Sequence, residues 1–184
     1  MNKQTKLSYA ILGLLQQPMT GYRLRKIFET TPMGNHSSGP GTIYPALKRL
    51  QKNGLIEQVD DPAMPDRPKK VFQLTGEGRR VLIDWLHKPI EQEDIPHNLA
   101  DLLLRFSFME PHVDGDTVTA FLTSLKTALE AYTASMAAFL ETSADGIPLH
   151  GRLSIENGIE AYRAQSRWAE YALEKINASN SKNR

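Results

Sequence analysis

Hydrophobic residues recur every three or four positions over most of the chain, and this spacing predicts a mainly α protein. The first such segment covers residues 6–16, and its apolar side chains share one helical face: Leu7, Ala10, Ile11, Leu14 and Leu15. A second helix is predicted to begin after Thr20, a residue type that caps helix N-termini. Residues 30–40 are rich in Gly, Pro, Ser and Thr and predict a loop.

A third helix is predicted from about Gly41 to Asn53, with Gly54 at the position where helices favour glycine. The face expected to be buried consists of Ile43, Ala46, Leu47 and Leu50. Pro45 is compatible with this helix only in its first turn, where the amides have no intrahelical partner. The opposite face offers three cations: Lys48, Arg49 and Lys52.

A hairpin and a fourth helix are predicted next. Residues 55–60 and 69–74 resemble strands, and the proline-rich segment between them is unsuited to strand pairing. Thr75 is placed to cap the fourth helix, although Gly78 stands where a capping box would have Glu. Three helices followed by two strands is the order of a winged helix-turn-helix, whose third helix enters the DNA major groove. The α+β first half is therefore predicted to be a DNA-binding domain covering residues 1–87.

The second half is predicted to be an all-helical dimerisation and effector domain, 97–178, joined by an acidic linker, 88–96. One helix is expected around 99–106, and the tail from Ala178 is expected to fray. Two longer helices, from 116 to 142 and after the break at 145–148, carry heptad seams that would bury each other. Five apolar residues beside these seams are expected to stay exposed, which predicts a homodimer: Phe121, Ala128, Leu140, Trp168 and Ala172.

Charge divides along the same boundary. Residues 1–86 hold 13 basic and 7 acidic side chains, a net +6, whereas residues 87–184 hold 9 and 14, a net −5. A basic first half favours a polyanionic partner, although chance segregation of charge would give the same balance. The wing contributes a compact basic cluster suited to phosphates: Arg67, Lys69 and Lys70.

Other chemistry finds little support in the residues. The chain has no cysteine, and none of its five histidines pairs with another at i, i+4, so we expect no metal and no cofactor. Asp114 and Asp116 are better explained as helix caps than as calcium ligands. No nucleophile elbow or phosphate loop occurs, so we expect no enzyme. The apolar stretch 9–15 is too short for a membrane span and lacks a cleavage-like tail, so we expect the cytosol.

Several spaced motifs, in order, resemble the PadR family of transcriptional regulators. They are Leu7-x-x-Ala10-Ile11-Leu12-Gly13-Leu14-Leu15, Gly21-Tyr22, Gly41-Thr42-Ile43-Tyr44-Pro45-Ala46-Leu47-x-x-Leu50, Gly54-Leu55-Ile56 and Phe72-x-Leu74-Thr75-x-x-Gly78 with Trp85-Leu86. The second half more weakly resembles the helical C-terminal domain of the longer members, shared with virulence-activator-type regulators. The chain departs from the family in having Met33-Gly34-Asn35-His36 where an aromatic is frequent, and Phe72 where Tyr is common.

The resemblance implies a homodimeric repressor that binds a pseudo-palindromic operator in double-stranded DNA and, in some relatives, releases it on binding a small aromatic effector such as a phenolic acid. By position, DNA contacts would come from Tyr22, Thr42, Tyr44 and Lys48, with the wing cations and Arg49 beside them. Tyr44 has the alternative of lying half-buried against the second helix, and Tyr22 of covering its own core.

An effector cavity between the two halves would be lined by aromatics and one cation: Trp85, Phe106, Tyr132, Trp168 and Arg105. Taken singly, each of these residues is better explained as core. A second function stays open, in which the winged helix is a protein-interaction module and the helical half binds a partner.

Overall fold

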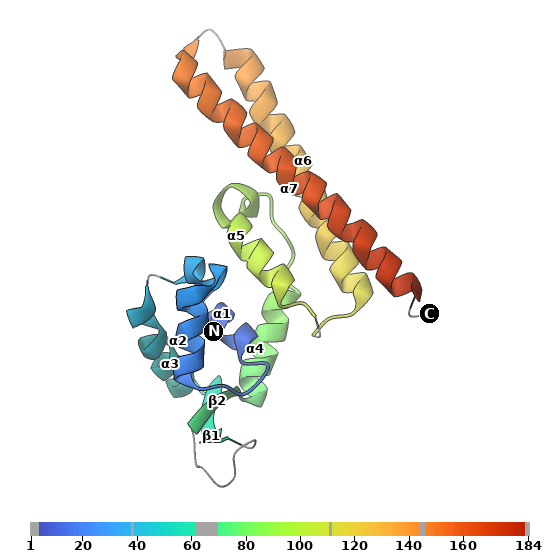
Figure 1. Ribbon diagram of the computed structural model, residues 1–184. Helices are drawn as coiled ribbons and strands as arrows, with labels where there is room; N and C mark the ends of the chain where they lie inside the picture. Colours follow the sequence, from blue (N-terminus) through green and yellow to red (C-terminus); the bar gives the residue numbers. More distant parts are fainter. Residues whose placement is uncertain (1–3, 38, 62–69, 111, 144–145, 183–184) are drawn as a thin grey trace. The chain divides into compact units, whose positions relative to one another are not determined.

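The computed structural model describes the whole chain except residues 1–3, 38, 62–69, 111, 144–145 and 183–184 (Figure 1). The chain divides into two compact units, Met1–Leu86 and His87–Arg184. The first unit contains α1 (Lys6–Leu14), α2 (Gly21–Thr30), α3 (Ile43–Lys52), β1 (Ile56–Asp60), β2 (Lys70–Leu74) and α4 (Gly76–Leu86). The second contains α5 (Asp94–Ser107), α6 (Gly115–Ser143) and α7 (Leu149–Lys182).

The first unit is a winged helix, as the order of predicted elements indicated. Its core is formed by all four helices with buried residues of the hairpin, and α3 buries the face expected of it: Ile43, Ala46, Leu47 and Leu50. Thr20 caps α2 by accepting a hydrogen bond from the amide of Arg23 at 3.2 Å, and Thr75 caps α4 in the same way through the amide of Gly78. Gly54 ends α3 with φ +70°, the conformation that favours glycine.

The missing capping box has a steric explanation. A β-carbon at position 78 would overlap the carbonyl oxygen of Leu55, because α4 passes directly over the chain that leads into β1. Position 78 therefore admits only glycine without a shift of the backbone, and no glutamate fits there.

The hairpin is antiparallel, with Ile56 opposite Leu74 and Asp60 opposite Lys70. One backbone bridge has no signal in the sequence pattern. Met19, between α1 and α2, exchanges two backbone hydrogen bonds with Phe72, of 3.1 and 2.9 Å. This bridge fixes the wing to the start of α2. The predicted loop 30–40 contains a short 3₁₀ turn, Pro32–His36, and a second turn, Pro40–Thr42, leads into α3, which begins at Ile43 and not at Gly41 as predicted.

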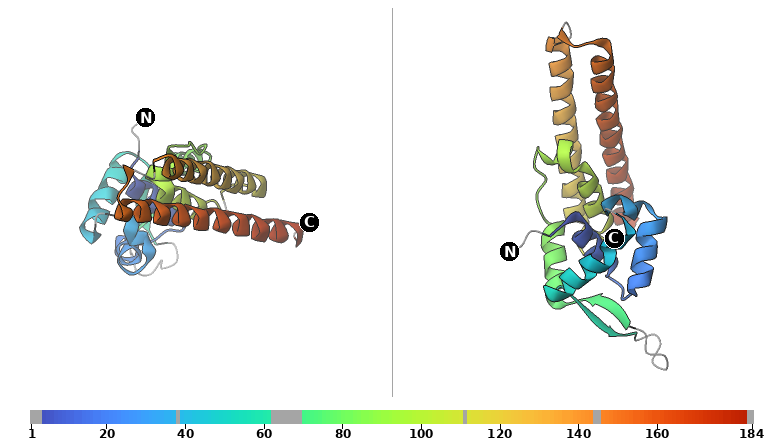
Figure 2. Two further views of the ribbon diagram at one scale, coloured as in Figure 1. Left: turned by 90° about the horizontal axis from the view of Figure 1, so that it is seen from above. Right: turned by 90° about the vertical axis from the view of Figure 1, so that its left-hand side faces the viewer.

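The second unit is a long helical hairpin with one additional helix. Figures 1 and 2 show α6 and α7 side by side and antiparallel. Tyr132 packs edge-on against Tyr162, and Lys126 bonds Glu170 at 2.8 Å. The acidic, proline-containing end of the expected linker is the first turn of α5, because acids and proline both suit that position. Helix α7 continues to Lys182, beyond the expected fraying at Ala178.

The expectation that five apolar edge residues remain exposed was wrong: two of them are buried, and Ala128, Leu140 and Trp168 are half-buried. Phe121 is 7% exposed and Ala172 is 9% exposed. The heptad seams predict α7 as the partner of α6, whereas in the structure α5 also packs on α6, with Phe106 stacked 6.3 Å from Phe121. Asp114 caps α6 as expected, accepting a hydrogen bond from the amide of Thr117 at 2.7 Å.

Candidate nucleic-acid interface

The outer face of α3 is the most strongly basic helical face that the sequence singled out. Lys48, Arg49 and Lys52 are all exposed, while the opposite face of the same helix is buried in the core. Pro45 lies in the first turn, where it removes no intrahelical hydrogen bond. The amphipathic pattern thus orients the cations toward solvent.

Two exposed tyrosines lie in or against the first turn of α2. Tyr22 is 61% exposed, so it does not cover the core, and the guanidinium of Arg25 lies 5.8 Å from its ring centre. Tyr44 of α3 is 46% exposed and packs its ring against that turn, where a β-carbon on Gly21 would lie 3.0 Å from Cε1. Glycine at position 21 therefore makes room for the ring, and Tyr44 is half-buried with its other side open.

Arg49 is not a free cation. Its Nη2 donates to the hydroxyl of Ser8 at 3.2 Å and to that of Thr5 at 3.4 Å. Thr5 caps α1 and Ser8 is completely buried, so Arg49 ties α3 to the N-terminus of α1. The hydroxyl of Thr42 is likewise engaged locally, donating to the carbonyl of Gly39 at 2.7 Å.

A hollow of about 490 Å³ lies between the start of α1 and the start of α3, and sequence reasoning missed two of its basic residues. Lys6 and His36 line it together with Thr42 and Arg49. Lys6 stands at the start of the first helix, just before its apolar stripe, and this position was the one sequence signal that could have indicated it as a lining residue. No sequence signal indicated His36.

The wing is only partly described. Lys70 extends from β2 and forms an exposed ion pair with Asp60 across the hairpin, at 2.8 Å. Arg67 and Lys69, two of the three predicted wing cations, lie outside the described residues.

Three of the five predicted effector residues come together in the second unit. Phe106 meets Trp168 edge-on with ring centres 5.4 Å apart, and the guanidinium of Arg105 lies 4.7 Å from the ring centre of Phe121, which stacks on Phe106. Arg105 is 3% exposed, and its Nε and Nη2 have no hydrogen-bond partner among the described residues. Burial lowers the pKa of Arg105, and the charge of Asp94 opposes that shift.

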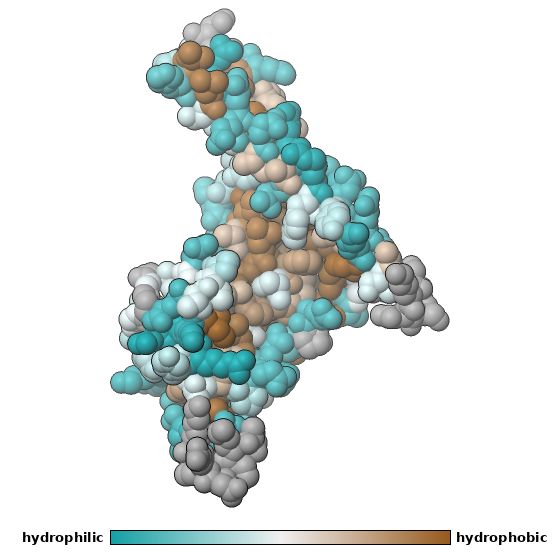
Figure 3. All heavy atoms as spheres, viewed as in Figure 1, coloured by the Kyte–Doolittle hydropathy of each residue, from teal (hydrophilic) through white to brown (hydrophobic). Residues whose placement is uncertain are grey.

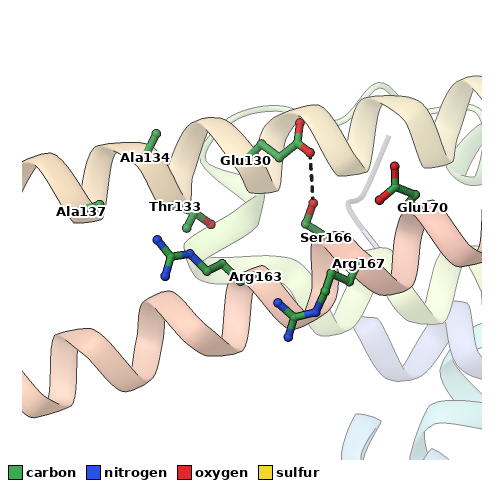
Figure 4. A pocket seen from close by; sticks show the side chains of 8 residues that line it. All are labelled: Glu130, Thr133, Ala134, Ala137, Arg163, Ser166, Arg167 and Glu170. Carbon is green, nitrogen blue, oxygen red and sulfur yellow. Dashed lines mark hydrogen bonds between the residues drawn. The ribbon is translucent and has the colours of Figure 1, made fainter.

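The other two residues lie elsewhere. Tyr132 packs on Tyr162 farther along the α6–α7 hairpin, and Trp85 belongs to the first unit, where it stacks on Tyr9 at 4.5 Å. A cavity of about 410 Å³ opens beside Phe106, between the end of α5, the start of α6 and the end of α7. A groove of about 370 Å³ runs between α6 and α7, with Arg163 and Arg167 on one helix and Ala134 and Ala137 on the other (Figure 4).

Across the parts of the chain that the structure describes, no helix is long and apolar enough to cross a membrane. Within the same described residues, no three His, Asp or Glu side chains gather as metal ligands would.

Residues 11–84 match the family model described as "Transcriptional regulator PadR-like family". The chain is 36% identical over 89 residues to the negative transcriptional regulator PadR of Bacillus subtilis, an alignment covering 47% of this chain and 49% of that protein. It is 33% identical over 91 residues to the transcriptional regulator YqjI of Escherichia coli, covering 49% and 40%. The chain thus spans about half the length of the curated relatives it matches, or less.

Among solved structures, the chain is similar to a PadR-like transcriptional regulator of Bacillus cereus, with 28% identity, 94% of this chain and 99% of that chain covered, and a TM-score of 0.41.

Proposed function

We propose that this chain is a sequence-specific DNA-binding regulator, and in particular a repressor, because residues 11–84 match the PadR-like family of transcriptional regulators. The observation that carries the proposal is the exposed basic face of α3 within a domain of that family. An α-helix fits the major groove, which is about 12 Å wide. The chain is then a DNA-binding protein and not an enzyme, and it acts in the cytoplasm.

Within this proposal the residues divide into three roles. Lys48 reads base edges from the middle of α3, because it is exposed and has no hydrogen-bond partner among the described residues. Tyr22, Tyr44 and Thr42 bind phosphates around the start of α2 and α3, since hydroxyl groups suit backbone contacts. The wing cations Arg67, Lys69 and Lys70 neutralise flanking phosphates, and Arg49 holds α1 against α3.

Binding to the DNA upstream of the chain's own gene tests this assignment. Fluorescence anisotropy should give sequence-specific binding that Lys48→Ala weakens, at a cost of about 1–3 kcal/mol for each base that is no longer read. Arg80→Ala is the matched control, because it removes a cation already held by Glu77 at 2.6 Å and Asp84 at 3.2 Å on α4. Equal affinity of the Lys48 variant and the parent for every sequence tried would rule out α3 as the reading helix.

The regulator is proposed to act as a homodimer on a pseudo-palindromic operator. The support is that the second unit exposes large apolar side chains: Phe139, Leu149, Leu153 and Tyr171. Exposed apolar surface of this kind is typical of interfaces. Sedimentation should find the full chain dimeric and the compact first unit, residues 1–86, monomeric.

A small anionic aromatic effector is proposed to release the DNA. The buried guanidinium of Arg105, with two unpartnered nitrogens beside Phe106, Phe121 and Trp168, supports a ligand that carries both a carboxylate and a ring. Phenolic acids added to the Trp85→Phe variant should change the emission of Trp168 and lower DNA affinity. No change in either quantity across a panel of such acids would contradict the effector.

A second candidate is a protein-interaction module, favoured by the same exposed apolar residues of the hairpin. Specific DNA binding that Lys48→Ala weakens favours the DNA-binding regulator over this second candidate, because an interaction module has no need of a base-reading lysine.

A further inference from the structure

The hollow beside the start of α3 gathers basic side chains from three separate segments of the first unit. It has a volume of about 490 Å³ and lies between the start of α1 and the start of α3. Lys6 of α1, His36 of the 3₁₀ turn Pro32–His36 and Arg49 of α3 all line it. None of the described residues that line it is acidic. A hollow with this lining favours an anion.

Arg49 fixes the α1 side of the hollow. Its Nη2 donates to the hydroxyls of Thr5 and Ser8, at 3.4 and 3.2 Å, so the start of α1 is held beside α3. Lys6 follows Thr5 directly in the chain and is therefore placed by the same two hydrogen bonds. Both partners of Arg49 are neutral hydroxyls, so the positive charge of its guanidinium still acts on the hollow.

The turn that carries His36 is held by its packing on α2. A β-carbon on Gly34 would lie 2.6 Å from the carbonyl oxygen of Phe28, so the turn passes directly against the last part of α2. The amide of Ser37 closes the turn with a 3.0 Å hydrogen bond to the carbonyl of Gly34. His36 is half-buried there. The fold thus brings His36 and Lys6, which lie far apart in the sequence, to the same hollow.

The hollow lies at one edge of the exposed face of α3. Successive residues of an α-helix are turned by about 100°, so Lys48 falls between Tyr44 and Arg49 around the helix. Tyr44 marks the edge that packs on the first turn of α2, and Arg49 marks the edge that contacts α1. Figure 3 shows that the surface over α2 and α3 is mostly hydrophilic on the face that it draws, as surfaces that bind DNA are.

The two edges of α3 correspond to the two sides of the major groove. A helix in that groove has a sugar–phosphate backbone on each side of it. With Lys48 directed at the bases, the edge at Tyr44 faces one backbone and the edge at Arg49 faces the other. The proposed phosphate contacts of Tyr22 and Tyr44 therefore fall on the first backbone, and the hollow lies toward the second.

We propose that the hollow binds a phosphate of the second DNA backbone, and that Lys6 and His36 are its ligands. This inference rests on the proposed DNA binding and extends the contact surface to α1 and to the turn Pro32–His36. Lys6 supplies a positive charge, and His36 supplies a ring N–H, which the neutral imidazole has in either tautomer. Contacts to both backbones fix the orientation of α3 in the groove without reading bases.

The salt dependence of DNA binding by the full-length chain tests this contact. Lys6→Gln should flatten the slope of log affinity against log salt by about 0.9 for each bound copy, because one phosphate is no longer neutralised. It should weaken preferred and unrelated DNA by the same factor, whereas Lys48→Ala should reduce the preference between them. Lys6→Arg keeps the charge and should retain the parent's slope.

His36→Ala tests the second ligand and should weaken both kinds of DNA about fivefold, through the loss of one hydrogen bond. Arg80→Gln is the matched control for Lys6→Gln, because it removes the same charge from α4, where Glu77 and Asp84 hold the guanidinium. This control should keep the parent's slope. Circular dichroism of each variant checks that its helices are intact.

A parent-like slope in Lys6→Gln, or a loss of slope that Lys6→Arg shares, would overturn the phosphate contact. Inorganic phosphate should leave the melting temperature of the DNA-free parent as it is in chloride of equal ionic strength, since the rest of the DNA is needed to bring the phosphate to the hollow. A rise that Lys6→Gln removes would assign the hollow to a free anion instead.

Failure of this contact is distinguishable from failure of the proposed function. If only the contact fails, the parent still prefers its own DNA and Lys48→Ala still weakens that preference, while Lys6→Gln keeps the parent's slope. If the DNA-binding proposal fails, the parent itself shows no preference among DNA sequences.

Discussion

The guanidinium of Arg49 on α3 donates a 3.2 Å hydrogen bond to the hydroxyl of Ser8, which is completely buried in α1. Arg49, which the sequence pattern predicts as a DNA-binding cation, thus holds α3 in place against α1. The distinction between Arg49 and its neighbour Lys48 is open to measurement.

Arg49→Ala is expected to lower the free energy of unfolding by about 1 kcal/mol, because it removes a hydrogen bond to a buried hydroxyl. Lys48→Ala should leave that free energy unchanged and lower DNA affinity instead. Urea unfolding and fluorescence anisotropy on the two variants measure both quantities. Equal stability of Arg49→Ala and the parent would show that the hydrogen bond contributes nothing to the fold.

The wing is expected to make DNA affinity depend on salt concentration without favouring any DNA sequence. Each neutralised phosphate adds about −0.9 to the slope of log affinity against log salt, so Lys69→Ala/Lys70→Ala should flatten the slope of a dimer by roughly 3 to 4. All DNA sequences should weaken alike. Asp60→Asn, which releases Lys70 from its 2.8 Å ion pair, should tighten binding at low salt. If the double variant keeps the parent's slope of log affinity against log salt, the wing does not contact the DNA phosphates.

Gly78→Ala is expected to destabilise the first unit by more than about 2 kcal/mol, since its β-carbon would overlap the carbonyl oxygen of Leu55. Gly76→Ala is the matched control on the same helix. A β-carbon there meets nothing within 4 Å, so that variant should be neutral or stabilising by about 0.5 to 1 kcal/mol. Thermal unfolding of the two variants side by side gives the comparison.

Arg105→Met is expected to separate folding from effector response. Its guanidinium is buried with two unpartnered nitrogens, so replacing it by an apolar side chain of similar length should leave the unfolding midpoint unchanged or higher. The same change should abolish release of DNA by phenolic acids. Arg152→Met, at an exposed position of α7, should change neither property. A large drop in stability of the Arg105 variant would instead mark a structural cation.

Asp114, which caps α6, is expected to make the stability of the fold depend on pH. The hydrogen bond from the amide of Thr117, the largest cause, lowers the pKa of Asp114 below its ordinary value. A carboxyl with a lowered pKa stabilises the fold above its unfolded pKa, about 3.9, and this stabilisation is lost as pH falls through the folded value. Asp114→Asn should therefore show a smaller fall in melting temperature below pH 4 than the parent.

Local signals in the amino-acid sequence were sufficient to place the helices of the winged domain and to define the buried face of α3, but not that of α1, where Leu7 and Leu14 are half-buried and Leu12 is completely buried. Thr20 and Thr75 cap, Gly54 ends α3, and the apolar spacing of 43–50 fixes the buried side. The basic character of the opposite face of α3 follows from the same periodicity, because a helix with one side in the core must turn the other to solvent.

Contacts between residues that lie far apart in the sequence, by contrast, are seen only in the folded chain. The tie from Arg49 to Ser8, the bridge from Met19 to Phe72 and the packing of Phe106 on Phe121 join segments between 15 and 53 residues apart, and no periodicity within one helix encodes such meetings. For the same reason the five predicted effector residues divided among three places, with Tyr132 on Tyr162 and Trp85 on Tyr9. A pattern along the chain fixes the face on which a side chain lies; the packing of one element on another fixes which side chain it meets.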